Sequence, residues 1–139
     1  MTGRSLGVCI YAIILAASCT KGSHSRSVDS GMLCSTLPDD AKTGGKRKRA
    51  EIEHKIAAHH AEFEACYRKA LEHDPKAAGR VETRFVIDPD GSVSSPCIHK
   101  TTLEDGEAVE CMLDQFRALR FGPAKGAMTV IYPLSYNPG

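Results

Sequence analysis

The sequence contains no tryptophan, and aromatic residues make up only 6% of its 139 residues. Any buried core is therefore mainly aliphatic and modest in size. The chain also lacks an excess of charge, since 18 lysines and arginines face 17 acidic residues and leave a formal net charge of +1. This balance argues against a nucleic-acid partner, because such binders carry a clear basic excess. No apolar run reaches about 18 residues with a stop-transfer flank, which argues against a multi-span membrane protein.

The motifs of common enzyme classes are missing as well. The sequence has no C-x-x-C redox pair, no G-x-S-x-G nucleophile motif and no Gly-rich phosphate loop. His60 and Glu64 share a helical spacing of four and His59 lies beside them, but two ligands do not make a zinc site. We expect a non-enzymatic protein without catalytic residues, metal or cofactor. The alternative is a small secreted enzyme or metal-binding protein that uses His59, His60 and Glu64, which would need a concave pocket.

Residues 1–18 have the pattern of an export signal. Arg4 precedes an apolar stretch, LGVCIYAIILAA, that is too short for a comfortable membrane span. Small residues then precede Cys19, as in the bacterial lipobox, although Ala16 stands where that motif usually has leucine. We expect Cys19 to be lipidated and the protein to be periplasmic, with Thr20 favouring the outer membrane over the inner membrane. Ordinary signal-peptidase cleavage and a buried N-terminal helix are the alternatives.

Residues 19–48 differ in composition from the rest of the chain. They are rich in serine, threonine, glycine and charge, and they offer little to bury. Such a segment cannot offset its ordering entropy, so it is expected to be a flexible, lipidated tether with a reach of about 30 Å. The basic run Lys46-Arg47-Lys48-Arg49 at its end is expected to be a solvated turn before a helix.

Residues 49–139 have the periodicities of a folded domain. Apolar residues at helical spacing predict one helix that ends at Asp74-Pro75 and a second one after Thr101-Thr102, closed by residues 121–123. Alternating residues predict strands over 80–87, 92–100 and 128–136, with a turn at 88–91 between the first two. The order is α-β-β-α-β. The economical α+β fold places both helices on one face of a three-stranded antiparallel sheet.

Short motifs recur in a fixed order across about residues 50–138. They are Cys66-Tyr67, Gly79-Arg80-Val81, Asp90-Gly91-Ser92-Val93, Thr101-Thr102-Leu103, Val109-Glu110-Cys111, Leu119-Arg120-Phe121-Gly122-Pro123 and Val130-Ile131-Tyr132-Pro133-Leu134. This ordered set resembles the C-terminal domain family of the AgmX and PglI gliding-motility proteins, within the TonB/TolA C-terminal superfamily. The family usually has proline directly after the phenylalanine that closes the second helix, whereas Gly122 intervenes here.

The resemblance implies a periplasmic protein-interaction module rather than a catalyst. TonB proteins use such a domain to capture a partner by adding a strand to its sheet. A complete energy transducer is not expected, because the seven prolines are scattered rather than gathered in a spacer and the N-terminus has the pattern of a cleavable signal. The expected partner is an envelope protein, in a motility or envelope-spanning assembly.

The cysteines suggest disulfides in an oxidising compartment. If Cys19 is lipidated and the signal is removed, the remaining cysteines permit three pairings. Cys66 and Cys111 lie on the two helices that should be neighbours, and the family resemblance favours this bridge as well. A second pair, Cys34 with Cys97, follows by elimination. The alternative is that these cysteines are buried and unpaired.

The final strand, 128–136, is expected at or near a sheet edge. An edge presents a row of free N–H and C=O groups, which invites strand addition by a partner. Pro133 removes one donor and limits uncontrolled pairing. Thr129 and Ile131 point away from the face of Val130 and Tyr132, so they are the expected partner-binding residues. In the alternative interpretation, this strand is only the third strand of the sheet.

Overall fold

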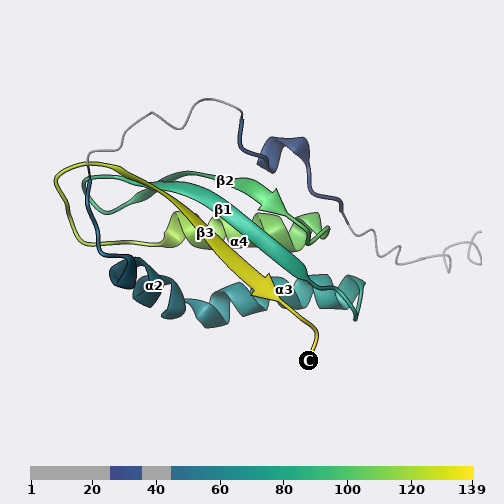
Figure 1. Cartoon of the computed structure of the whole chain (residues 1–139). Helices are drawn as coiled ribbons and strands as arrows, with labels where there is room; N and C mark the ends of the chain where they lie inside the picture. Colours follow the sequence, from purple (N-terminus) through teal and green to yellow (C-terminus); the bar gives the residue numbers. More distant parts are fainter. Residues whose placement is uncertain (1–25, 36–44) are drawn as a thin grey trace, which may run out of the picture.

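The computed structural model describes residues 26–35 and 45–139, so the expected signal peptide and Cys19 lie outside the described residues. The chain forms an α+β fold (Figure 1). Its elements are a 3₁₀ turn η2 (Ser30–Met32), helices α2 (Arg49–Ala57), α3 (His60–His73) and α4 (Gly106–Ala118), and strands β1 (Gly79–Ile87), β2 (Val93–Thr101) and β3 (Met128–Tyr136).

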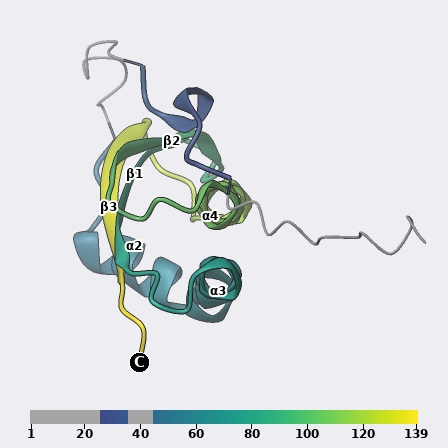
Figure 2. The ribbon, with the colours of Figure 1, turned by 90° about the vertical axis from the view of Figure 1, so that its right-hand side faces the viewer.

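The three strands form one antiparallel sheet in the order β2-β1-β3. This arrangement confirms the predicted fold class. In the central strand β1, alternate side chains from Val81 to Ile87 are fully buried, as the period of two requires. Figure 2 shows α3 and α4 on one side of the sheet, where these buried side chains point.

Phe116 of α4 lies at the centre of the core. Its ring centroid is 4.9 Å from that of Phe63 on α3 and 5.1 Å from that of Phe85 on β1. All three rings are almost completely buried. One aromatic side chain therefore joins both long helices to the sheet, which compensates for the small number of aromatic residues.

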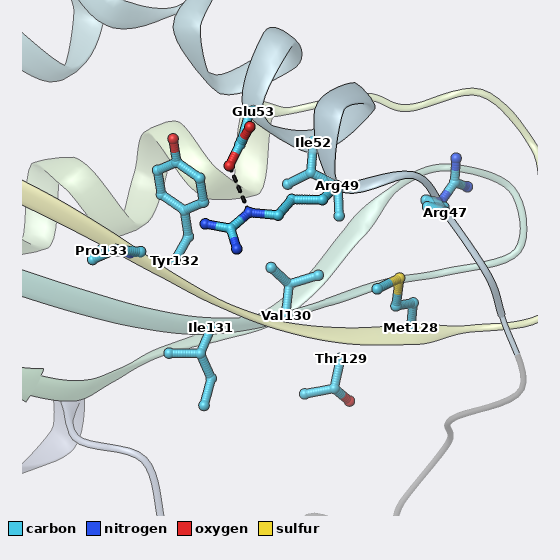
Figure 3. A pocket seen from close by; sticks show the side chains of 10 residues that line it. All are labelled: Arg47, Arg49, Ile52, Glu53, Met128, Thr129, Val130, Ile131, Tyr132 and Pro133. Carbon is cyan, nitrogen blue, oxygen red and sulfur yellow. Dashed lines mark hydrogen bonds and ion pairs between the residues drawn. The ribbon is translucent and has the colours of Figure 1, made fainter.

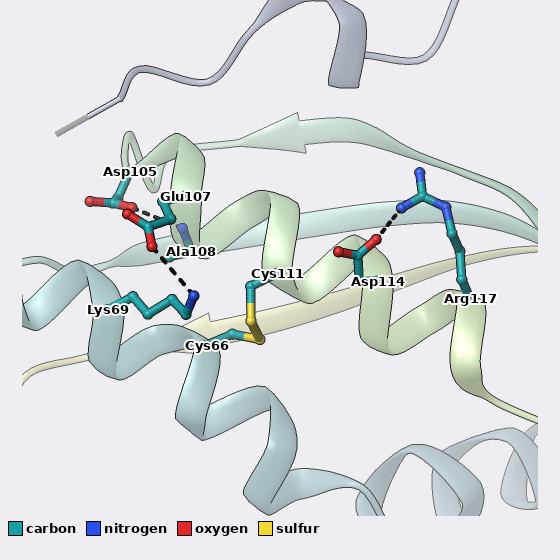
Figure 4. Close-up of a disulfide and its surroundings, with 8 residues drawn as sticks. All are labelled: Cys66, Lys69, Asp105, Glu107, Ala108, Cys111, Asp114 and Arg117. Carbon is teal, nitrogen blue, oxygen red and sulfur yellow. Dashed lines mark hydrogen bonds and ion pairs between the residues drawn. A yellow bond between two sulfur atoms is a disulfide. The ribbon is translucent and has the colours of Figure 1, made fainter. Parts of the chain in front are cut away.

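A disulfide joins Cys66 of α3 to Cys111 of α4 (Figure 4). Cys66 is buried and Cys111 is half-buried. The apolar stripe of α4, which includes Val109, Met112 and Phe116, is fully buried. Cys111 lies beside that stripe and bonds to α3, so the two helices are linked to each other directly.

The helix expected to run unbroken to Asp74 is two helices, α2 and α3. They meet at Ala58 and His59, where His59 leaves the helical conformation with φ −107° and ψ 19°. The buried stripe survives this break because the His59 N–H still donates to the Ile56 carbonyl and the Phe63 N–H to that of His59. The apolar period persists across the bend, so the sequence pattern cannot reveal it.

The expected tether requires a correction at residues 26–35, which pack against the domain. Gly106 N–H donates to the Arg26 carbonyl, and Ser27 forms a β-bridge with Asp105 at the start of α4. Further along, Leu33 forms a parallel bridge with Ile98 of β2, and Cys34 is disulfide-bonded to Cys97. The covalent bond and the backbone pairing hold a segment whose own side chains bury little.

Gly91 fixes the turn between β1 and β2. Its φ of +91° lies in the region that favours glycine, and a Cβ here would come within 1.9 Å of the Phe121 carbonyl oxygen. Phe121 N–H donates to the Gly91 carbonyl, and Ser92 forms a β-bridge with Arg120. The turn is therefore attached to the connection that leads from α4 to β3.

Candidate functional site

The two edges of the sheet differ in their covering. The β2 edge carries the N-terminal segment, through the Leu33–Ile98 bridge and the hydrogen bond from Cys34 N–H to the Ile98 carbonyl. On the β3 side, none of the described residues forms a strand beyond β3. Gly45 contacts only the entry to this strand, where its N–H donates to the Ala127 carbonyl. The prediction that the final strand is an edge strand is thus confirmed.

The expected partner-binding residues both lie on β3. Thr129 is opposite Val86 and Ile131 is opposite Arg84 in the ladder with β1. Ile131 has an exposed fraction of 44%, which is unusual for a large apolar side chain in this chain, and Thr129 is half-buried. Both side chains point away from α2, whereas Val130 and Tyr132 point towards it (Figure 3). Substitutions at Thr129 therefore avoid the core face of the strand.

A groove of about 420 Å³ runs between the start of α2 and β3 (Figure 3). Its walls are the buried Ile52 from α2 and the half-buried Met128, Val130 and Tyr132 from β3. The groove follows the strand from Met128 to Pro133, so it lies beside the free edge. An extended peptide paired with β3 would have an apolar surface for alternate side chains on this side.

Arg49 extends over this groove from the first turn of α2. Its side chain is 90% exposed, and its Nε donates to Oε1 of Glu53 at 2.7 Å. The hydrogen bond and charge of Glu53 raise the pKa of Arg49 above its ordinary value. Within the part of the chain that the structure describes, the two Nη nitrogens of Arg49 make no hydrogen bond or ion pair. They remain available to a carbonyl or carboxylate group.

The basic run at residues 46–49 was expected to be a solvated turn, but this prediction is wrong for Arg47. Its side chain is only 3% exposed and pairs with Glu51 at 3.0 Å. It also donates to the Gly122 carbonyl and lies 5.7 Å from the centre of the Phe121 ring. The aromatic ring and the backbone carbonyl bind a guanidinium group that the sequence pattern assigned to solvent. Arg47 is therefore held in place at the end of the groove, while the Nη nitrogens of Arg49 remain available to a ligand.

The residues of the alternative metal or enzyme site lie at the start of α3. His60 Nε2 is 3.6 Å from Oε1 of Glu64, and both side chains are exposed. His59 instead turns towards Glu62, with its Nδ1 3.9 Å from Oε1 of that residue. Among residues 26–35 and 45–139, no group of three or more histidine, cysteine or acidic side chains could hold a metal ion.

Sequence reasoning missed an ion pair between His73 and Asp105. His73 Nδ1 lies 2.6 Å from Oδ2 of Asp105, whose side chain is only 6% exposed. The other oxygen of Asp105 accepts from Ala108 N–H and caps α4 (Figure 4). The Asp-Gly-Glu sequence before an apolar stripe signals such a cap, but nothing in the sequence pairs it with the end of α3.

The His73–Asp105 pair predicts a pH dependence of stability. The hydrogen bond that the His73 imidazole donates to the Asp105 carboxylate raises the pKa of His73 above its ordinary value of 6.5, and desolvation opposes this only in part. Folded protein thus binds a proton more tightly than unfolded protein. The stabilisation is complete below pH 6.5 and is lost as the pH rises through the folded-state pKa. We expect the melting-temperature advantage over His73→Gln to shrink across that range, whereas a constant difference would contradict this linkage.

Comparison of the chain with protein-family models, with curated proteins and with solved structures finds no match. Within the described residues, no helix has the length and apolar character to cross a membrane. The candidate site is therefore argued from its own geometry, namely a free strand edge, an adjoining apolar groove and an exposed arginine.

Proposed function

We propose that this chain is a periplasmic lipoprotein, non-enzymatic, whose folded domain binds an envelope protein by accepting an extended segment at the β3 edge. The single observation that carries this proposal is the asymmetry of the sheet. Leu33 and Cys34 pair with the β2 edge and are fastened there by the Cys34–Cys97 disulfide, whereas none of the described residues forms a strand beyond β3, which lies beside a groove. Natural proteins cover or interrupt edges that they do not use, because an open edge invites pairing.

The side chains around β3 suggest how a partner is selected. Backbone hydrogen bonds to an edge strand supply affinity without regard to sequence, and the adjoining pockets supply specificity. Here the groove takes apolar side chains on the α2 side, and Ile131 contacts the opposite side of the added strand. Arg49 supplies donors at the rim. Pro133 limits the pairing to the first part of the strand, from Met128 to Tyr132.

The resemblance to the AgmX/PglI domains favours a role in a motility or envelope-spanning assembly. The two disulfides suit an oxidising compartment, which agrees with export. The alternative of a small enzyme or metal-binding protein would use the exposed His60–Glu64 pair. Among the described residues, no third histidine, cysteine or acidic side chain joins this pair to form a possible metal site. We therefore advance the interaction module alone.

The Thr129→Arg substitution tests the site. Thr129 is opposite Val86, and on the other side of Val86 lies Ser94 of β2, so one row of the sheet offers a matched pair of positions. We expect Thr129→Arg to lower the yield of in-cell crosslinks to the partner about tenfold, which corresponds to about 1.4 kcal/mol of binding. Ser94→Arg places the same charge at the covered edge and is expected to leave the yield unchanged. Equal yields for both variants, with the fold intact by circular dichroism, would rule out β3 as the recognition surface.

A further inference from the structure

The ordered N-terminal segment changes where the folded domain begins. If residues 26–35 were not attached to the domain, the first described residue held by it would be Gly45, which bonds to Ala127. The structure instead attaches residues 26–35 to the domain. Arg26 bonds to Gly106 through its backbone and lies 3.6 Å from Glu110 through its side chain, and Cys34 is bonded covalently to Cys97.

The consequence is a large reduction in the distance that the folded domain can move away from Cys19. From Cys19 to Arg26 a fully extended chain spans at most about 25 Å, whereas from Cys19 to Gly45 it spans about 90 Å. A domain of about 100 residues is about 35 Å across, from its expected radius of gyration. With Cys19 in the membrane, β3 then stays within about 60 Å of the membrane surface.

We propose that the Cys34–Cys97 disulfide keeps the link between the lipid anchor and the folded domain short. This link, residues 19–25, is called the leash below, and it restricts the β3 site to the layer next to the membrane. The partner of the β3 site is then a protein of that same membrane. This inference rests on the proposed lipid anchor and strand-accepting edge. A protein fixed to the same membrane gains effective concentration when the leash is short, while one fixed beyond the layer is out of reach. Arg26 and Ser27 lie beside the start of α4, an element other than β3.

The first test measures the leash without depending on lipidation in the cell. In protein that begins at Cys19, the four other cysteines are in the two disulfides, so Cys19 is the one free thiol. It is coupled to a maleimide lipid in phosphatidylcholine vesicles that contain an acceptor-labelled lipid. A donor amino acid replaces Ser135, which is exposed on β3. Energy transfer from this donor reports the height of β3 above the membrane.

We expect strong energy transfer for the oxidised protein and a clear decrease for Cys34→Ala with Cys97→Ala, which is expected to release residues 26–35 from the domain. A second variant keeps the disulfide and inserts about 19 Gly/Ser residues before Arg26. It gives directly the energy transfer expected for a long link between Cys19 and the domain. Equal transfer in the oxidised protein and the insertion variant would overturn the leash, even if the cysteine variant failed to fold.

The second test identifies the membrane of the partner. A photocrosslinking amino acid at position 135 captures the partner in cells, and the crosslinked protein is assigned to a fraction. A protein of the same membrane supports the inference, while a soluble protein or one of the opposite membrane contradicts it. Release of a Cys19→Ser variant from membranes tests the anchor separately, so failure of the proposed function is distinguishable from failure of the leash.

Discussion

Replacing Cys66 and Cys111 together with alanine is expected to lower the free energy of unfolding by about 4 kcal/mol. The bond closes a loop with a sequence separation of 45 residues, and its loss restores that loop's entropy to the unfolded chain. Both cysteines lie on long helices that remain fixed in the folded state, so only the unfolded state gains freedom. The melting temperature should fall by roughly 15–30 °C, as measured by calorimetry under oxidising conditions.

The second disulfide provides a matched control. Cys34 and Cys97 enclose a longer separation of 63 residues, so loop entropy alone predicts an effect at least as large. However, removing this bond also frees residues 26–35 in the folded state, which offsets part of the entropy gained on unfolding. We therefore expect a smaller decrease for Cys34→Ala with Cys97→Ala. The opposite order, or free thiols at Cys66 and Cys111 in exported protein, would contradict this account.

Phe116→Ala is expected to destabilise the fold by about 3–5 kcal/mol. The ring is fully buried and contacts Phe63 and Phe85, so its removal leaves a cavity between both helices and the sheet. A small domain has only about 5–15 kcal/mol of stability in total, so this substitution should remove a large part of the free energy of unfolding. Denaturant unfolding followed by circular dichroism measures the change. Phe116→Leu retains most of the volume and should cost less; equal costs would mean that the site collapses freely.

The strands could be predicted from the sequence because their signals are local. In β1 and β3, the alternate side chains on one face are mainly apolar, and the Asp88–Gly91 turn marks where β1 must reverse. The third element of this kind, β2, carries Pro96 and a positive φ at Ser95, and its register with β1 shifts in two places. A proline within a strand indicates an interruption or an edge position, but it could not place these register shifts because they depend on the partner strand.

The N-terminal segment and the groove could not be predicted, for a different reason. Residues 26–35 have the composition of a linker, and what orders them is a covalent bond and backbone pairing to distant elements. Arg47 is buried by Phe121 and Gly122, far away in the sequence. The groove itself exists only because the fold brings together α2 and β3, which are the first and last elements of residues 49–139 in the sequence. Long-range contacts of this kind leave no periodic pattern in the chain.

The order β2-β1-β3 also has a consequence for the way the chain folds. β1 and β2 are adjacent in the sequence and can pair as soon as both are available, but β3 follows α4 and reaches β1 last. Until then, the side of β1 that β3 will occupy is itself an open edge, in a chain whose helices are already forming. A strand offered by another protein at this stage would compete with β3 for β1. The slow step of folding is therefore expected to be the docking of β3, the strand that we propose as the partner-binding edge.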